Sequence, residues 1–207
     1  MNQTNFEVKM KILKAAKILF ASKGYDQTSV RDICNDAGVN IMMISYHFQG
    51  KENVLSSIFQ SSMQLLDFTG EKEATENPIL RLTRIVRNVS SLRINDPDMM
   101  SILQQEITLP KPRNEIIQFL ITPLWSELEE LLLLGKRLKL FKYDSLETTI
   151  IFIISSVFMS RQLEFFNRNI QDPVDDIEEI TTRMSSLILG ALKCPEQELK
   201  SILLEEV

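Results

Sequence analysis

A group of polar side chains offers hydrogen bonds or charge between residues 28 and 51: Thr28, Ser29, Asn40, Ser45, Tyr46, His47 and Lys51. His47 is the only histidine, so a multi-histidine metal site is excluded, and a Ser-His-carboxylate arrangement would have to use this one residue. The sequence also contains no glycine-rich phosphate loop and no Cys-x-x-Cys pair. We therefore expect a binding protein, not an enzyme, with no metal and no cofactor.

Residues 37–55 predict the end of one helix, a tight turn and a second short helix. Gly38 is free to take a positive φ, and Asn40 is a favourable N-cap for the helix that follows. Val39 precedes this cap and can pack on Ile44 as a hydrophobic staple. The stretch is therefore typical of a helix-turn-helix.

The second helix of this motif has two distinct faces. Ile44 and Phe48 are four residues apart and share one face, while Met42, Ser45 and Tyr46 project from another side. The first face suits a small core, and the second is free to contact another molecule. A helix-turn-helix has this division when its second helix enters a DNA major groove.

A longer ordered pattern surrounds the motif. After an amphipathic first helix come Phe20, Gly24 and Tyr25, Thr28 to Val30, Asp32 and Ile33, Ala37 to Val39, Tyr46 to Phe48, and Lys51 with Glu52. This pattern resembles the N-terminal DNA-binding domain of the TetR family of transcriptional regulators. The resemblance implies an all-α fold, with an N-terminal three-helix helix-turn-helix DNA-binding domain and a C-terminal helical ligand-binding and dimerisation domain.

Base contacts are expected from Asn40, Ile41, Met42 and Ser45, at the exposed start of the recognition helix. Ile41 and Met42 can contact thymine methyl groups, and Asn40 can hydrogen-bond a base unless capping occupies it. Many family members carry Gly or Pro and a small polar residue where this chain has Met42 and Met43, and Tyr is common at Ser45. No arginine is present here to bind guanine, so we expect modest direct readout assisted by DNA shape.

Phosphate contacts are expected from Thr28, Ser29, Tyr46, His47 and Lys51, because hydroxyls, amines and helix N-terminal amides commonly bind phosphate oxygens. Three of these residues have a structural alternative. Lys51 would then be a solvated lysine, Tyr46 would pack on the following helix, and His47 would be a structural histidine.

The distribution of charge bears on nucleic-acid binding. The net charge of the chain is −5, which by itself disfavours DNA. Residues 1–60 hold seven Lys or Arg and five Asp or Glu, which leaves 16 and 23 for residues 61–207. The first part is therefore +2 and the remainder −7, so the charge favours DNA at one end only.

Apolar spacing and capping signals predict helices along the whole chain. They cover residues 6–22, a segment capped by Thr28 or Ser29, the recognition helix, and residues 51–68, 78–94, 97–109, 115–134, 144–167 and from 172, with a short helix from Pro195. Gly135 is expected to end one helix, and Asp144 with Glu147 to cap the next. The expected domains are 1–50, a helix-turn-helix DNA-binding domain with its motif at about 29–48, and 51–207, an effector-binding and dimerisation domain.

Aromatic residues of the second domain are candidates for an effector site. Pro123 should kink its helix and leave a gap beside it. Phe119, Pro123 and Trp125, with Phe152 and Phe158, would line a site for a small apolar effector. The alternative is that these side chains are plain core.

The last two long helices carry more apolar surface than one partner face needs. In the TetR family the corresponding pair forms a four-helix dimer interface, so the resemblance implies a homodimer. Two cysteines 160 positions apart, with no signal peptide, suit the reducing cytoplasm. The longest apolar run, Thr148 to Ser160, is too short to span a bilayer, and we expect no membrane segment.

Together these features predict a dimeric transcriptional regulator, a repressor that a small-molecule effector releases from double-stranded DNA. Two recognition helices in successive major grooves require a palindromic operator with half-sites about 34–36 Å apart or slightly more. The alternative hypothesis is a helix-turn-helix protein controlled by a protein partner instead of a small ligand.

Overall fold

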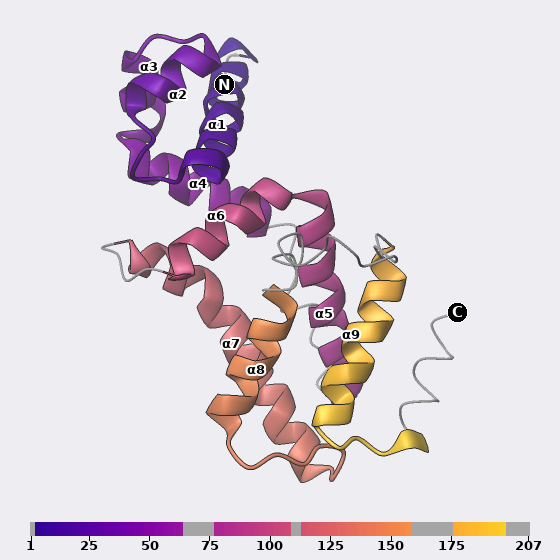
Figure 1. Cartoon of the computed structure of the whole chain (residues 1–207). Coiled ribbons are helices and arrows are strands. Elements are labelled where there is room, and N and C mark those ends of the chain that lie inside the picture. Colours follow the sequence, from indigo (N-terminus) through magenta and orange to yellow (C-terminus); the bar gives the residue numbers. More distant parts are fainter. Residues whose placement is uncertain (1–2, 64–76, 109–112, 159–175, 198–207) are drawn as a thin grey trace. The chain divides into compact units, whose positions relative to one another are not determined.

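The computed structural model of the chain describes residues 3–63, 77–108, 113–158 and 176–197, and this part contains helices and no strand. Figure 1 shows the helices in chain order. They are α1 (Gln3–Lys23), α2 (Val30–Ala37), α3 (Met42–Phe48), α4 (Lys51–Met63), α5 (Pro78–Asn95), α6 (Pro97–Thr108), α7 (Asn114–Arg137), α8 (Leu146–Phe158) and α9 (Ile177–Ala191). The predicted all-α class is confirmed.

The chain divides into two compact units. The first unit comprises Met1–Leu66 and Asp96–Leu120, and the second comprises Asp67–Asn95 and Ile121–Val207. α6 and the start of α7 are thus grouped with the helix-turn-helix, whereas the sequence suggested a boundary after residue 50. The functional boundary stays a prediction, because compactness does not report which residues bind DNA or an effector.

The core of the first unit forms where the apolar stripes of α1 to α4 meet. α1, α3 and α4 bury residues three or four positions apart, as amphipathic helices on a core do, and α2 buries the adjacent Ile33 and Cys34. A three-helix core of this size buries little apolar surface on its own, and α4 and α6 enlarge it. The buried apolar side chains of α1 to α4 are Ile12, Ala15, Ala16, Phe20, Ile33, Cys34, Ile44, Phe48, Val54, Leu55, Ile58 and Phe59.

Polar contacts fasten α6 to α1 and α4. Asp96 caps α6 through Oδ1, and its Oδ2 accepts hydrogen bonds from Lys17 of α1 and from Ser62 of α4. Gln105, near the other end of α6, donates through Nε2 to the Ala21 carbonyl at 2.9 Å. That carbonyl belongs to the last turn of α1, where carbonyls lack a partner within the helix. The start of α6 is therefore held against α1 and α4, and its other end against α1.

In the second unit, α5 and α9 lie side by side (Figure 1). α8 also contacts both helices. Their facing sides are apolar, and the buried residues include Leu82, Val86, Val89, Ile150, Ile153, Ile180, Ile188 and Leu189.

The predicted end of the seventh helix is wrong. Gly135 lies inside α7, which continues to Arg137. The backbone reaches the left-handed region only at Lys139, which has a φ of 61°. Gly135 is needed there because the ring of Phe141 packs against its Cα, leaving no room for a side chain.

The predicted cap of the eighth helix is also wrong. Ser145, not Asp144 paired with Glu147, lies before the first residue of α8, and its hydroxyl oxygen accepts from the Thr148 amide at 3.2 Å. Serine and aspartate are about equally good caps, so the local sequence does not choose between neighbouring candidates.

Two other predicted starts are confirmed: Pro78 opens α5 behind Asn77, and Pro97 opens α6 behind Asp96. The predicted helical residues 64–68 and 159–167, the cap at Asp172 and most of the helix after Pro195 lie outside the described residues.

None of the described helices is both long and apolar enough to cross a bilayer.

Candidate nucleic-acid interface

The helix before the turn, α2, begins with a reciprocal capping box. The Ser29 hydroxyl accepts from the Asp32 amide at 3.1 Å, and the Asp32 carboxylate accepts from the Ser29 amide at 2.8 Å. The Ser29 hydroxyl also donates to Asp32 at 2.7 Å, and this bond, followed by the backbone bond, lowers the pKa of Asp32. Of the two predicted caps, Ser29 is therefore the one used.

A glycine ends α2 and starts the turn. Gly38 has a φ of 64° and a ψ of 37°, the left-handed conformation that a side chain disfavours. The Val39 amide then donates to the Cys34 carbonyl at 3.0 Å, which satisfies one of the last carbonyls of the helix. The predicted role of Gly38 is confirmed.

Asn40 caps the recognition helix α3. Its Oδ1 accepts from the Met42 amide at 2.9 Å. Ile41, between them, has no side-chain cap of its own, but its φ of −56° and ψ of −30° are already helical. The Asn40 oxygen is therefore occupied, which leaves its amide nitrogen as the group that can donate to a base.

The two faces of α3 separate as the sequence predicts. Ile44 and Phe48 are buried in the first unit, whereas Met42 and Tyr46 are each 70% exposed. Ile41 is 46% exposed, and Ser45 also lies on the outer side. A set of large apolar and aromatic side chains is therefore presented outward by a helix of seven residues. Tyr46 is mostly exposed, and its packing on α4 stays an untested alternative.

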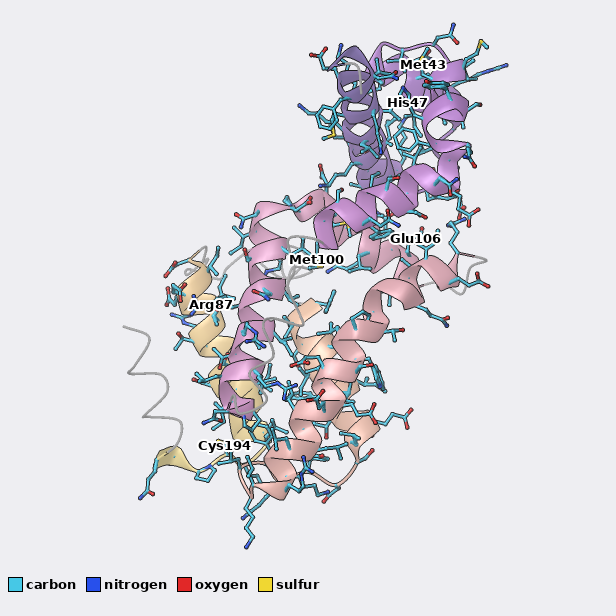
Figure 2. All side chains as sticks on the ribbon, turned by 180° about the vertical axis from the view of Figure 1, so that it is seen from behind. Met43, His47, Arg87, Met100, Glu106 and Cys194 are labelled. Atoms are coloured by element: carbon cyan, nitrogen blue, oxygen red, sulfur yellow. The ribbon has the colours of Figure 1, made fainter. Side chains whose placement is uncertain are left out.

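His47 lies on α3 between the exposed and buried faces; Figure 2 labels it together with Met43 on the same helix. Its ring meets the Tyr46 ring edge to face, with centroids 4.9 Å apart. The Nε2 atom is buried and has no hydrogen-bond partner among the described residues. Both readings of His47, phosphate contact and structural residue, stay predictions.

Lys51, at the start of α4, points into the protein instead of into solvent. Its Nζ donates to the Tyr25 carbonyl at 2.8 Å and to the Thr28 carbonyl at 2.7 Å. The same ammonium lies 4.0 Å from the centroid of the Tyr25 ring. Burial lowers its pKa. The solvated-lysine alternative is wrong, because Lys51 ties α4 to the turn that precedes α2.

Thr28 is likewise used inside the protein. The residue is buried, and its hydroxyl donates to the Gly24 carbonyl at 2.8 Å. The phosphate contacts predicted for Thr28 and Lys51 stay predictions. Both side chains already form hydrogen bonds within the protein. Of the predicted phosphate contacts, Ser29 and Tyr46 are exposed, and Tyr46 is 70% exposed.

Arg113, at the start of α7, is a residue of this region that sequence reasoning missed. Its guanidinium lies 3.9 Å from the centroid of the Tyr25 ring and pairs with Asp26 and Glu106, each at 3.0 Å. Its partners lie 7 or more positions away along the chain, so no local pattern marks it. Among the described residues, no group of three or more His, Cys, Asp or Glu is placed to hold a metal.

Residues 12–58, which run from the middle of α1 to Ile58 of α4, match the family of bacterial regulatory proteins described as the tetR family. Residues 12–58 of this chain are therefore a domain of the tetR-family type. The matched residues contain the whole helix-turn-helix, including the caps Ser29 and Asn40 and the exposed face of α3.

Proteins similar to this chain include the probable HTH-type transcriptional regulator YttP of Bacillus subtilis strain 168, which is 30% identical over 105 residues. That match covers 49% of this chain and 51% of YttP, so the chain matches about half the length of this curated relative. The fold is similar to the crystal structure of HlyIIR, a hemolysin II transcriptional regulator. The identity is 27%, the TM-score 0.72, and the coverage 91% of this chain and 98% of that one.

A second similar structure is AibR in complex with isovaleryl coenzyme A and operator DNA. Its TM-score is 0.68, and the match covers 87% of this chain and 97% of that one. The identity is 20%, so this likeness concerns the fold.

The predicted effector residues differ in how far their side chains are exposed. Phe158 is buried and Trp125 is half-buried, whereas Pro123 and Phe152 are exposed; the Phe119 side chain lies outside the described residues. α7 is continuous through Pro123. The apolar effector site and the kink therefore stay predictions.

Proposed function

We propose that this chain regulates transcription by binding DNA through α3. The observation that carries the proposal is the 70% exposure of both Met42 and Tyr46 on a helix whose Ile44 and Phe48 are buried. Large apolar side chains are costly to leave in water, and an outward-facing group of them marks a contact surface. The apolar contacts available to Ile41 and Met42 are thymine methyl groups in the major groove.

We further propose that two copies bind together. Ile151 and Phe152 on α8 are 50% and 45% exposed, and Leu187 on α9 is 69% exposed. These residues give α8 and α9 apolar surface beyond that which packs within the second unit, as a helical dimer interface requires. A two-fold dimer presents two copies of α3, so its operator is an inverted repeat with half-sites about 34–36 Å apart or slightly more.

The proposed effector is a small apolar molecule that releases a repressor from DNA. The complex of the similar AibR fold with isovaleryl coenzyme A supports acyl-coenzyme A thioesters as the first class to test. Only their acyl chain is apolar, since the coenzyme A part carries charged phosphates. A coupling of about 1–3 kcal/mol between effector and DNA would change operator affinity by about 5–150-fold. A regulator that acts on bacterial genes in this way works in the cytoplasm.

Selection of DNA from a random duplex pool by the purified full chain tests the DNA-binding proposal. We expect the enriched sequences to share an inverted repeat whose two halves are about one helical turn apart. A pool that stays random after several rounds at low ionic strength would contradict the proposal, because electrostatic binding is strongest there.

Denaturation midpoints measured with acyl-coenzyme A thioesters of different chain length test the effector. A ligand that binds the folded protein raises the midpoint, and one that acts as an effector also weakens operator binding. If no thioester or apolar ligand shifts the midpoint while operator binding is intact, the effector proposal is wrong. Control by a protein partner is then the better hypothesis.

A further inference from the structure

The turn between α1 and α2 is held by a cluster of charged groups around one aromatic ring. Tyr25 lies in this turn, with the Lys51 ammonium 4.0 Å and the Arg113 guanidinium 3.9 Å from its ring centroid. Cations are attracted to the electron-rich face of such a ring at distances below about 6 Å. Two residues that are distant in the sequence, at the starts of α4 and α7, therefore meet on Tyr25.

Two carboxylates balance these two cations. The Arg113 Nε donates to Glu106 at 3.0 Å, and its Nη1 pairs with Asp26 at 3.0 Å. Glu106, labelled on α6 in Figure 2, is buried, whereas Asp26 is exposed. Burial of Arg113 would by itself lower its pKa, but the bonds to Glu106 and Asp26 raise it. The guanidinium of Arg113 thus pairs with the buried Glu106 of α6 and with Asp26 of the turn.

This turn contacts both helices that flank the recognition helix, α2 and α4. Its far end is Ser29, the cap of α2, and two of its carbonyls, those of Tyr25 and Thr28, accept from Lys51 at the start of α4. α3 has only seven residues, so its orientation is set by α2 before it and α4 after it. A shift of the turn would therefore change the direction in which Met42 and Tyr46 point.

We propose that Arg113 is a positioning residue for DNA recognition, which holds the turn around Tyr25 and through it the orientation of α3. Arg113 itself is only 9% exposed and its charge is paired, so it does not serve as a phosphate contact. The inference rests on the proposed DNA binding, and it adds a residue outside the helix-turn-helix to the groups that determine operator affinity.

The test compares the full wild-type chain with Arg113→Gln, Arg113→Lys and the control Arg137→Gln. Arg137 is the last residue of α7, the helix that Arg113 directly precedes; it is exposed and far along the chain from the turn. Affinity for the selected inverted repeat is measured over a range of salt concentrations, and amide hydrogen exchange is measured at residues 25–33 without DNA. Arg113→Lys keeps the charge but loses the planar guanidinium that both stacks and forms two hydrogen bonds.

We expect Arg113→Gln to weaken operator affinity by about 5–150-fold, the usual range for coupling between separate parts of a protein. The slope of log affinity against log salt should stay unchanged, because no phosphate contact is lost. Amides of residues 25–33 should exchange faster, Arg113→Lys should fall between Arg113→Gln and wild type, and Arg137→Gln should match wild type.

Two outcomes would overturn the inference. Operator affinity of Arg113→Gln within twofold of wild type would show that the turn does not depend on Arg113. A salt slope smaller in magnitude by about 0.9 would make Arg113 a direct phosphate contact instead of a positioning residue.

A second variant covers the case in which Arg113→Gln does not fold. Tyr25→Leu removes the ring but keeps the pairing of Arg113 with Glu106. It should weaken affinity at unchanged salt slope, and wild-type affinity would overturn the inference. If the wild-type chain itself selects no sequence, the DNA-binding proposal fails separately. Hydrogen exchange at residues 25–33 then still decides whether Arg113 holds the turn.

Discussion

Gly135 and Phe141 are packed so closely that the aromatic ring occupies the space of a side chain. A Cβ built on Gly135 would lie 2.0 Å from Cδ2 and 2.4 Å from Cε2 of the Phe141 ring. Phe141 is fully buried, and its amide donates to the Gly135 carbonyl at 3.1 Å. The end of α7 and the segment after it are thus joined at a glycine inside a helix.

Gly135→Ala should therefore destabilise the protein, even though alanine is the better helix former. Overpacking against a buried ring costs about 1–3 kcal/mol, which outweighs or offsets the gain of about 1 kcal/mol in helix propensity. Unfolding in urea followed by circular dichroism measures the change. Gly190→Ala is the matched control, because a Cβ there has no atom within 4 Å and should not destabilise the chain. Equal stability of both variants would contradict the packing argument.

Arg81 and Glu127 form a buried ion pair in the second unit, with 2.8 Å between Nε and Oε1 and side chains 9% and 2% exposed. Arg81→Met should lower the free energy of unfolding by about 3–5 kcal/mol, because the buried carboxylate loses its cation. The double variant Arg81→Met with Glu127→Leu should recover most of that loss, since apolar replacements remove both charges. A double variant no more stable than Arg81→Met would contradict this account.

Ionisation of Asp32 makes the free energy of unfolding depend on pH. Its folded-state pKa is lowered, first by the Ser29 hydroxyl and then by the Ser29 amide, so the ionised carboxylate stabilises the folded state. The contribution is complete above the ordinary pKa of 3.8 and is lost as the pH falls through the lower folded-state value.

Asp32→Asn should accordingly be less stable than wild type at neutral pH, and the difference should shrink below the ordinary aspartate pKa. Thermal unfolding of both proteins across this range measures it, with Asp36→Asn on the same helix as the control for net charge. A difference that is constant with pH would contradict the assigned role of the carboxylate.

Leu187→Glu tests the proposed pairing of two copies through α8 and α9. Burying a carboxylate in an apolar interface is unfavourable, so we expect the dimer to weaken by about 2 kcal/mol or more and operator affinity to fall with it. Light scattering coupled to size exclusion gives the mass in solution. Leu138→Glu, an equally large change at an exposed leucine outside α8 and α9, should leave the dimer intact. A wild-type protein with the mass of a monomer in solution would contradict the proposed dimer.

Local signals in the sequence were sufficient for much of the fold. Asn77 and Asp96, each followed by proline, mark the starts of α5 and α6, and Ser29, Gly38 and Asn40 mark the ends of the helices around the turn. Each of these residues acts through backbone groups within four positions of itself, so its effect is readable from neighbouring residues.

The remaining features depend on contacts between distant parts of the chain. Gly135 is required by Phe141, which packs against it from beyond the end of the helix, and the sequence alone shows only a glycine near a predicted helix end. Lys51 turns inward because the carbonyls of Tyr25 and Thr28 are brought to it from more than 20 positions away. For the candidate site, the exposed face of α3 followed from its helical spacing, whereas Arg113 did not, because its partner Tyr25 lies on another segment.

The central claim is that the exposed face of α3 reads DNA sequence. Its most direct test is the affinity of the full chain for the selected inverted repeat and for a scrambled duplex of the same length and composition, at physiological salt. The account predicts a preference of about 10³-fold or more for the inverted repeat. Met42→Ala and Tyr46→Ala should each reduce affinity for the inverted repeat. Equal affinity of the wild-type chain for the two duplexes would contradict it.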